Sequence, residues 1–173
     1  PGISRLKTEL CHSERLDDGI SLLLSDSVDV PMTCGVLRPV IFVPPNFLRS
    51  TPEQQRMVLS HELAHIRRYD VAWQWMARTS KAFYWCHPLA WWLERRMRLE
   101  REFACDDAVV NMGEVPASYA THLVDVAARF VRVQPQTLAV GMASQSCVER
   151  RIRALLNANK NRRPLGKTAG RVV

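Results

Sequence analysis

Residues 51–68, TPEQQRMVLSHELAHIRR, form the clearest helix pattern of the sequence. Thr51 is a favourable N-cap, Pro52 suits the first helical position, and Gln54 completes a capping box. The apolar residues that follow point around most of the helix circumference: Met57, Val58, Leu59, Leu63, Ala64 and Ile66. This pattern predicts a helix buried in the middle of a domain, so that polar side chains on it need partners.

The same helix carries His61-Glu62-Leu63-Ala64-His65, an HExxH pattern. Two histidines four residues apart project from one helix face, about one turn apart. Imidazole is a good ligand for Zn²⁺, and a glutamate beside the first histidine can act as a general base. The alternative is a pair of ordinary core histidines, hydrogen-bonded to backbone or hydroxyl groups. Burial of two imidazoles and a carboxylate without an ion would cost several kcal/mol, which favours the metal site.

Two histidines leave a catalytic zinc site one protein ligand short. Eight other side chains offer a third donor: His87, Glu94, Glu100, Glu102, Cys105, Asp106, Asp107 and His122. Glu102 and Asp106 lie one helical turn apart on one face, so that Glu102 can bind the metal while Asp106 orients a ligand imidazole. This division of roles favours Glu102. The competing interpretation is an exposed i,i+4 ion pair between Glu102 and Arg98.

Other local patterns place this helix in an α+β domain. Short β-type runs precede it, at residues 20–24, 28–30 and 40–43. They predict a small N-terminal sheet of about three or four strands. Helical patterns occupy residues 3–16, 71–83, 89–111 and 116–132. A second capping box, Ser146 with Glu149, predicts a last helix from 146 to about 157–159.

Composition narrows the class of protein. A length of 173 residues predicts one domain with a single core. The longest apolar run has five residues, against about 20 for a bilayer span, and the N-terminus lacks a signal-peptide pattern. Five cysteines without a C-x-x-C pair argue against a disulfide framework and a thiolate zinc finger. A reducing compartment is therefore expected.

The net charge of +7 lies at the C-terminal end. Residues 149–173 hold eight basic residues and one acidic residue, whereas residues 1–148 hold 16 of each sign. We therefore predict a domain at 1–158 and a basic tail at 159–173. The tail is interpreted as a linker or as a juxtamembrane segment attracted to an anionic membrane surface. Nucleic-acid binding is disfavoured, because the tail lacks interleaved aromatic residues and a nucleic-acid-binding motif.

All five tryptophans fall between the two halves of the expected metal site, at positions 73, 75, 85, 91 and 92. Such a cluster more often fills a core between helices, because aromatic side chains bury a large area. The alternative is a hairpin that lies at a bilayer surface or against membrane-spanning helices, where tryptophan is also enriched.

Three motifs in this order resemble the BlaR/MecR-type antirepressor peptidases, family 56 of the metallopeptidases. They are MTCGVLRPVIFVPP at 32–45, HELAHIRRYD at 61–70 and EFACDDAV at 102–109. The sequence ERRI at 149–152 is similar as well, so that the resemblance spans about residues 20–156.

The resemblance implies a zincin-like metalloprotease of the gluzincin type. His61, His65 and Glu102 would bind Zn²⁺, Glu62 would be the catalytic carboxylate, and Asp106 would support a ligand. It further implies an endopeptidase domain at the cytoplasmic face of a bacterial membrane, set between the spanning helices of a receptor that cleaves itself or a repressor. Without a spanning helix or sensor of its own, this chain is expected to be the soluble domain.

Substrate contacts and activity follow from the same resemblance. Gluzincins hold a polypeptide substrate as an added strand beside the metal, and the segment expected here is Thr33, Cys34, Gly35 and Val36. The competing role of Gly35 is a plain turn or bulge. Tyr119 and His122 are available to stabilise an oxyanion, although ordinary helix packing is the favoured interpretation. The alternative to an active enzyme is a catalytically silent metal-binding signalling module.

Overall fold

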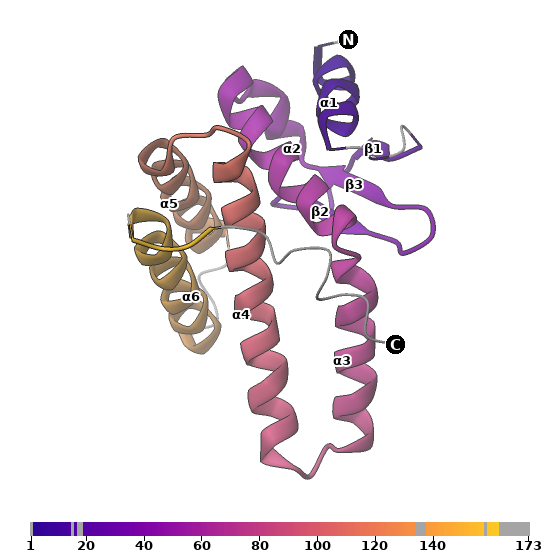
Figure 1. The fold of residues 1–173 in the computed structure, drawn as a ribbon, viewed down its shortest axis with the longest axis vertical. Coiled ribbons are helices and arrows are strands. Elements are labelled where there is room, and N and C mark those ends of the chain that lie inside the picture. Colours follow the sequence, from indigo (N-terminus) through magenta and orange to yellow (C-terminus); the bar gives the residue numbers. More distant parts are fainter. Residues whose placement is uncertain (1, 15, 17–18, 134–137, 158, 163–173) are drawn as a thin grey trace.

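The computed structural model describes residues 2–14, 16, 19–133, 138–157 and 159–162 (Figure 1). Its elements are α1 (Gly2–Ser13), β1 (Ser21–Leu24), β2 (Met32–Cys34), β3 (Val40–Val43), the 3₁₀ helix η1 (Pro45–Arg49), α2 (Pro52–Arg67), α3 (Asp70–Phe83), α4 (Pro88–Asn111), α5 (Pro116–Val133) and α6 (Leu138–Leu156). This order confirms the α+β class, with a small sheet near the N-terminus followed mostly by helices. None of the described helices combines the length and the apolar character that crossing a bilayer requires.

The helix that carries the HExxH motif, α2, begins where the sequence predicts. The Thr51 hydroxyl accepts a hydrogen bond from the Gln54 backbone at 3.3 Å, and the Gln54 side chain accepts one from the Thr51 backbone at 3.2 Å. Both halves of the capping box are therefore present, and they fix the start of the helix. Leu59, Leu63 and Ala64 are completely buried, which confirms that α2 runs through the middle of the domain.

The sheet holds α2 from one side. Its strand order is β1-β3-β2, with β1 parallel and β2 antiparallel to the central strand β3. Ile41 and Val43 of β3 are buried in one cluster with Leu59 and Leu63 of α2, and Leu10 of α1 completes that cluster. β2 lies at one edge of the described sheet, next to the face of α2 that carries the histidines.

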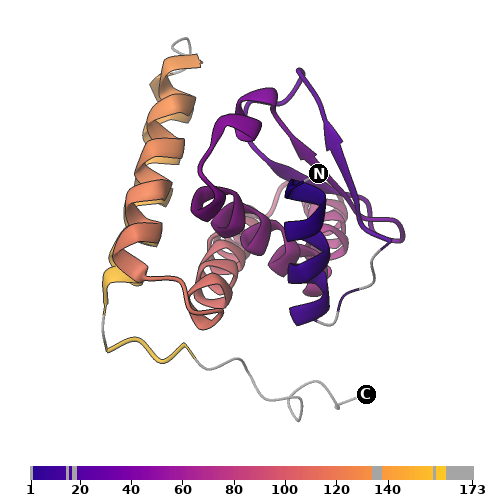
Figure 2. The same ribbon diagram turned by 90° about the horizontal axis from the view of Figure 1, so that it is seen from above.

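Helix α4 holds α2 from the other side, and the residues between these two helices are small. Ala64 of α2 packs with Cys105 and Ala108 of α4 in a cluster of its own. Small side chains let helix axes approach closely, so Glu102 of α4 comes near the histidines. The α5–α6 pair lies alongside α4 (Figures 1 and 2), and Tyr119 and Leu155 anchor the pair in a cluster with Val109 of α4.

Two local predictions are wrong. The structure describes residues 28–30 without a strand, and the second strand forms at Met32–Cys34 instead. Pro31 lacks a backbone N–H and restricts the residue before it, so pairing with β3 begins only after this proline. The last helix begins at Leu138, so that the Ser146 and Glu149 pattern lies inside α6 and does not start it. Alanine, leucine and methionine upstream favour helix, which overrides the local capping signal.

Helices α3 and α4 form an antiparallel hairpin that projects away from the sheet (Figure 1). All five tryptophans are on this hairpin, and all are exposed to solvent. The prediction that they fill a core is therefore wrong. Two helices alone cannot enclose side chains of this size, and the tip of the hairpin extends past the elements that would cover them.

The turn between β2 and β3 provides a test of the sheet. Gly35 has a φ of +86°, and a Cβ atom there would lie 2.5 Å from the Arg38 carbonyl oxygen. Gly35→Ala should lower the free energy of unfolding by about 3 kcal/mol, since it adds left-handed strain and a backbone clash. Gly113→Ala is the matched control, because Gly113 has a φ of +101° but open space around the same position. Urea denaturation should show a loss of only about 1–2 kcal/mol for the control. Equal losses would contradict the described turn.

Candidate metal centre

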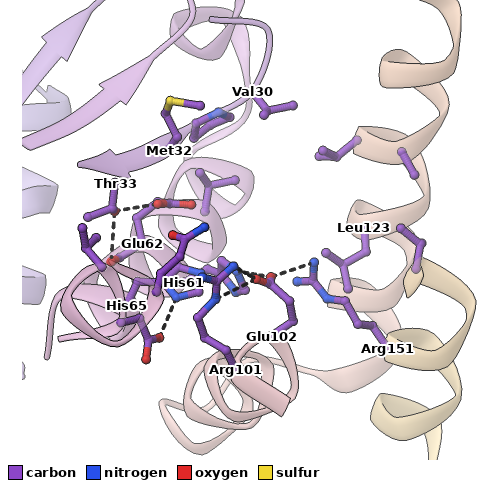
Figure 3. Close-up of a pocket in the computed structure, with 18 of the residues that line it drawn as sticks. Val30, Met32, Thr33, His61, Glu62, His65, Arg101, Glu102, Leu123 and Arg151 are labelled. Atoms are coloured by element: carbon purple, nitrogen blue, oxygen red, sulfur yellow. Dashed lines mark hydrogen bonds and ion pairs between the residues drawn. The ribbon is translucent and has the colours of Figure 1, made fainter. Parts of the chain in front are cut away.

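A cavity of about 760 Å³ opens over the histidine face of α2 (Figure 3). The edge strand β2 forms one wall, and helices α5 and α6 form the opposite wall. The lining includes Thr33, His61, Glu102, Leu123 and Arg151, which come from five different elements. The cavity therefore lies where the sheet, the HExxH helix and the C-terminal helices meet.

His61, His65 and Glu102 form a donor group at this cavity, and their ligand atoms all lie within 4.8 Å of one another. His61 Nε2 is 3.5 Å from Glu102 Oε2. Two ligands of a tetrahedral Zn²⁺, each about 2.1 Å from the ion, are about 3.4 Å apart, so the spacing fits such an ion. Two imidazoles and one carboxylate are also the donor types of a catalytic zinc site.

Each histidine directs its Nδ1 towards a buried carboxylate. His61 Nδ1 is 3.0 Å from the Tyr119 hydroxyl and 3.4 Å from Asp106 Oδ1. Tyr119 in turn donates its hydroxyl hydrogen to Asp106 at 2.8 Å. His65 Nδ1 is 2.8 Å from Asp70 Oδ2. Acceptors in these positions keep the proton on Nδ1, so Nε2 is the nitrogen that presents a lone pair to an ion.

Arg151 of α6 compensates the charge of two carboxylates, the buried Asp106 and the half-buried Glu102. Its guanidinium donates two hydrogen bonds to Asp106, at 2.6 and 2.8 Å, and lies 3.2 Å from Glu102 Oε2. Burial alone would raise the pKa of Glu102 and of Asp106, but His61 and Arg151 hold both pKa values well below their ordinary range. Both carboxylates are therefore ionised at neutral pH.

The same carboxylates act on His61. Burial alone would lower the pKa of His61, but Asp106 and Glu102 outweigh burial and raise this pKa to about 9. A protonated His61 balances the charge of Glu102 in the metal-free protein. A metal ion that binds to Nε2 takes the place of this proton, so metal binding and proton release are linked.

The other candidate third ligands have different partners. His87 is the N-cap of α4, Glu94 pairs with Lys81, Glu100 pairs with Arg96, and Asp107 pairs with Lys160 and Arg162. His122 lines the cavity but is outside the donor group found among the described residues. Arg98 pairs with Glu94. The exposed ion pair between Arg98 and Glu102, considered as the competing interpretation, is therefore not the one that forms.

A second donor group shares His65 and consists of His65, Asp70 and Cys105. Cys105 Sγ is 3.1 Å from His65 Nδ1 and 3.5 Å from Asp70 Oδ2. Burial, with the charges of Asp70 and Glu102, raises the pKa of the Cys105 thiol far above its usual value. A protonated thiol is a poor metal ligand. Cys105 and Asp70 are therefore suited to orienting His65 rather than to holding a second ion.

Glu62 is buried beside the donor group and accepts a hydrogen bond from the Thr33 hydroxyl at 2.6 Å. The edge strand therefore positions this carboxylate. Of the residues expected to bind substrate, Thr33 and Cys34 lie on β2 and line the cavity. Gly35 and Val36 lie in the turn after β2, and the positive φ of Gly35 agrees with the turn interpretation.

The prediction from sequence gave no site role to Asp70 or Arg151, and it favoured ordinary packing for Tyr119. Asp70 follows Tyr69, whose left-handed conformation (φ 54°) turns the chain back towards His65. Tyr119 is buried as expected of a packing residue, but its hydroxyl also binds Asp106. In the sequence, Arg151 is one of the eight basic residues counted near the C-terminal end, and nothing there singles it out. An acidic residue five positions after the second histidine is a sequence signal for Asp70. The contact of Arg151 depends on how α6 packs, so no local pattern predicts it.

Comparison with known proteins gives a family match over most of the chain. The family described as BlaR1 peptidase M56 matches residues 3–155. The regulatory protein BlaR1 of Bacillus licheniformis is 33% identical over 102 residues, which cover 58% of this chain. The matched part covers only 17% of that relative. The chain thus matches only a small part of the length of that relative.

The Arg151 contacts lead to a stability prediction. Arg151→Ala leaves Asp106 buried without its cation and should lower the free energy of unfolding by about 3–5 kcal/mol. Arg150→Ala is the matched control, because the neighbouring Arg150 is exposed, and it should change stability by less than about 0.5 kcal/mol. Urea denaturation measures both. An Arg151→Ala protein as stable as the control would show that Asp106 needs no cation.

The raised pKa of His61 leads to a pH prediction for the metal-free protein. The pKa of His61 is about 9 in the folded protein and 6.5 in the unfolded chain, so folding favours the protonated imidazole. The resulting contribution to stability is complete below pH 6.5. This contribution, about 3 kcal/mol, is lost as the pH rises through 9. NMR titration in the presence of a chelator should give the His61 ring a midpoint near 9, with the resonance assigned by its loss in His61→Gln. A midpoint near the ordinary value would contradict the contacts with Asp106 and Glu102.

Proposed function

Because the chain belongs to the M56 peptidase family, we propose that it is the zinc-dependent endopeptidase domain of a membrane-anchored signalling receptor, with a zincin-like fold of the gluzincin type. The observation that carries this proposal is the donor group of His61, His65 and Glu102 with the Glu62 carboxylate beside it. The cavity above the group opens along an edge strand, as an enzyme that acts on extended peptides requires.

Each residue of the site would have a separate role in peptide hydrolysis. His61, His65 and Glu102 would hold Zn²⁺, which when bound supplies Lewis-acid polarisation of the scissile carbonyl and acidifies a water molecule. Asp106 would keep the His61 ring in place through Nδ1. Glu62 would accept the proton from the water and deliver it to the leaving amine. Thr33 would hold the Glu62 carboxylate in the orientation for both transfers.

The substrate would lie along β2. This strand pairs with β3 on one side, and its residues Thr33 and Cys34 line the cavity. An extended polypeptide placed there would pass over Glu62. His122 also lines the cavity. The Tyr119 hydroxyl already binds Asp106, so Tyr119 is suited to supporting His61 rather than to contacting substrate.

The similarity to a regulatory protein suggests the identity of the polypeptide substrate. We propose that the substrate is the receptor itself or a repressor, cleaved at the cytoplasmic face of a bacterial membrane beside the receptor's own spanning helices. We do not propose nucleic-acid binding, because Lys160 and Arg162 of the basic tail pair with Asp107. Residues 163–173 of that tail lie outside the described part of the chain.

A catalytically silent metal-binding module is the alternative, and one substitution separates it from an enzyme. Glu62→Gln removes the proposed base but none of the proposed ligands, so it should lower cleavage of an unfolded protein substrate about 10²- to 10⁴-fold while zinc content stays at one ion per chain. The matched control is Glu149→Gln, which alters an exposed carboxylate paired with Arg153 and should cleave at the wild-type rate.

Chelation and re-addition of zinc complete this experiment. A chelator should stop cleavage, and zinc should restore it to the wild-type protein but not to Glu62→Gln. Zinc binding without cleavage by the wild-type protein would favour the silent module. Equal cleavage by the wild type and Glu62→Gln would exclude Glu62 as the base.

A further inference from the structure

The tip of the α3–α4 hairpin carries an aromatic surface for which the proposed peptidase function has no use. We define the hairpin tip as residues 82–93. Residues 82–89 are all exposed, with Phe83 79% and Trp85 70% exposed. Of residues 71–98, all of which the structure describes, none is buried. An apolar surface this large is rare on a protein that contacts only water, so the hairpin tip has a partner.

The exposed aromatic side chains lie on more than one side of the hairpin tip. Trp91 and Trp92 are consecutive on α4 and therefore point about 100° apart. Both are exposed, as are Tyr84 and Trp85 in the connection between the helices. The Trp91 indole donates to the Trp85 carbonyl oxygen at 2.8 Å, which ties the connection to α4. A protein partner would cover one face of the hairpin tip. Exposed aromatic side chains on several sides of the tip instead suit an environment that surrounds it.

The charge of the hairpin indicates what this environment is. Residues 71–98 include five basic residues and one acidic residue, Glu94. The basic residues lie behind the tip on both helices: Arg78, Lys81, Arg95, Arg96 and Arg98. Lys81 and Arg98 pair with Glu94, and Arg96 pairs with Glu100 just beyond this range, so the net positive charge of residues 71–100 is +3. Lys81 lies over the Trp91 ring at 4.7 Å from its centre, so a cation borders the aromatic surface directly. With a rise of 1.5 Å per residue, Arg95 and Arg96 are only about 10–12 Å along α4 from its first residue, Pro88.

We propose that the hairpin tip inserts into the interface of an anionic phospholipid bilayer. The tryptophans would lie at the level of the headgroups, as tryptophan prefers, with Arg78 of α3 and Arg95 of α4 facing the lipid phosphates. The tip would enter from one side to the depth of an interfacial element, since the described helices are not of the bilayer-spanning kind. This contact goes beyond the proposed peptidase function, because it uses none of the residues of the metal centre.

Intrinsic fluorescence offers a specific readout, because all five tryptophans of the chain lie on this hairpin. Vesicles of phosphatidylcholine with phosphatidylglycerol should shift the tryptophan emission of the full chain to shorter wavelength. Lipids brominated near the headgroup should quench it. Vesicles of phosphatidylcholine alone should bind more weakly, by roughly fivefold for each basic residue that contacts lipid.

Variants assign the binding to the hairpin tip. Trp85→Ser with Trp92→Ser should lower vesicle affinity at least about tenfold, since two large apolar side chains are lost. Leu37→Ser is the matched control, because Leu37 is 95% exposed in the turn between β2 and β3, and its affinity should equal the wild type. Circular dichroism should show that both variants keep the wild-type helix content.

Three outcomes would overturn the proposal. The first is an emission spectrum that vesicles leave unchanged. The second is vesicle binding without quenching by brominated lipid and without an effect of the tryptophan variants, which would assign the binding to the basic tail. The third is a blue shift that depends on protein concentration in the absence of vesicles, because a second copy of the chain would then cover the tip.

Discussion

The ionised carboxylate of Asp106, only 2% exposed, is the group on which the arrangement of the helices depends. A buried charge is tolerated only when it is paired and hydrogen-bonded. His61 from α2, Tyr119 from α5 and Arg151 from α6 all direct polar atoms at Asp106 on α4. Four helices are thereby held in one relative position. The same position brings Glu102, one turn earlier on α4, to 3.5 Å from His61 Nε2, so the packing of the C-terminal half shapes the donor group.

The small sheet contributes in a different way. Its central strand packs on the apolar side of α2, while its edge strand reaches the polar side, where Thr33 binds the Glu62 carboxylate. One strand thus positions the proposed base and borders the cavity in which a peptide would lie. The hairpin of α3 and α4 differs from α2, because its aromatic side chains are exposed to solvent. The proposed metal centre thus lies on a buried helix, whereas the hairpin is exposed.

Features set by neighbouring residues were predictable from the sequence. The capping box at Thr51, the burial of α2 and the shared face of Glu102 and Asp106 all follow from helix geometry. Features set by distant residues were not. Arg151 reaches Asp106 only because α6 packs beside α4, and the start of α6 follows the helix-forming residues before Ser146 rather than the capping signal. The rule that tryptophans fill cores failed because, among the described residues, no further helix packs against the tip of α3 and α4.

X-ray absorption spectroscopy of the zinc-loaded protein reports which atoms surround the ion. We expect nitrogen and oxygen neighbours at about 2.0–2.2 Å, from His61, His65 and Glu102, and loss of one protein ligand in Glu102→Ala. A sulfur neighbour at about 2.3 Å would contradict this expectation, since the ion would then be bound by Cys105 in the group with Asp70.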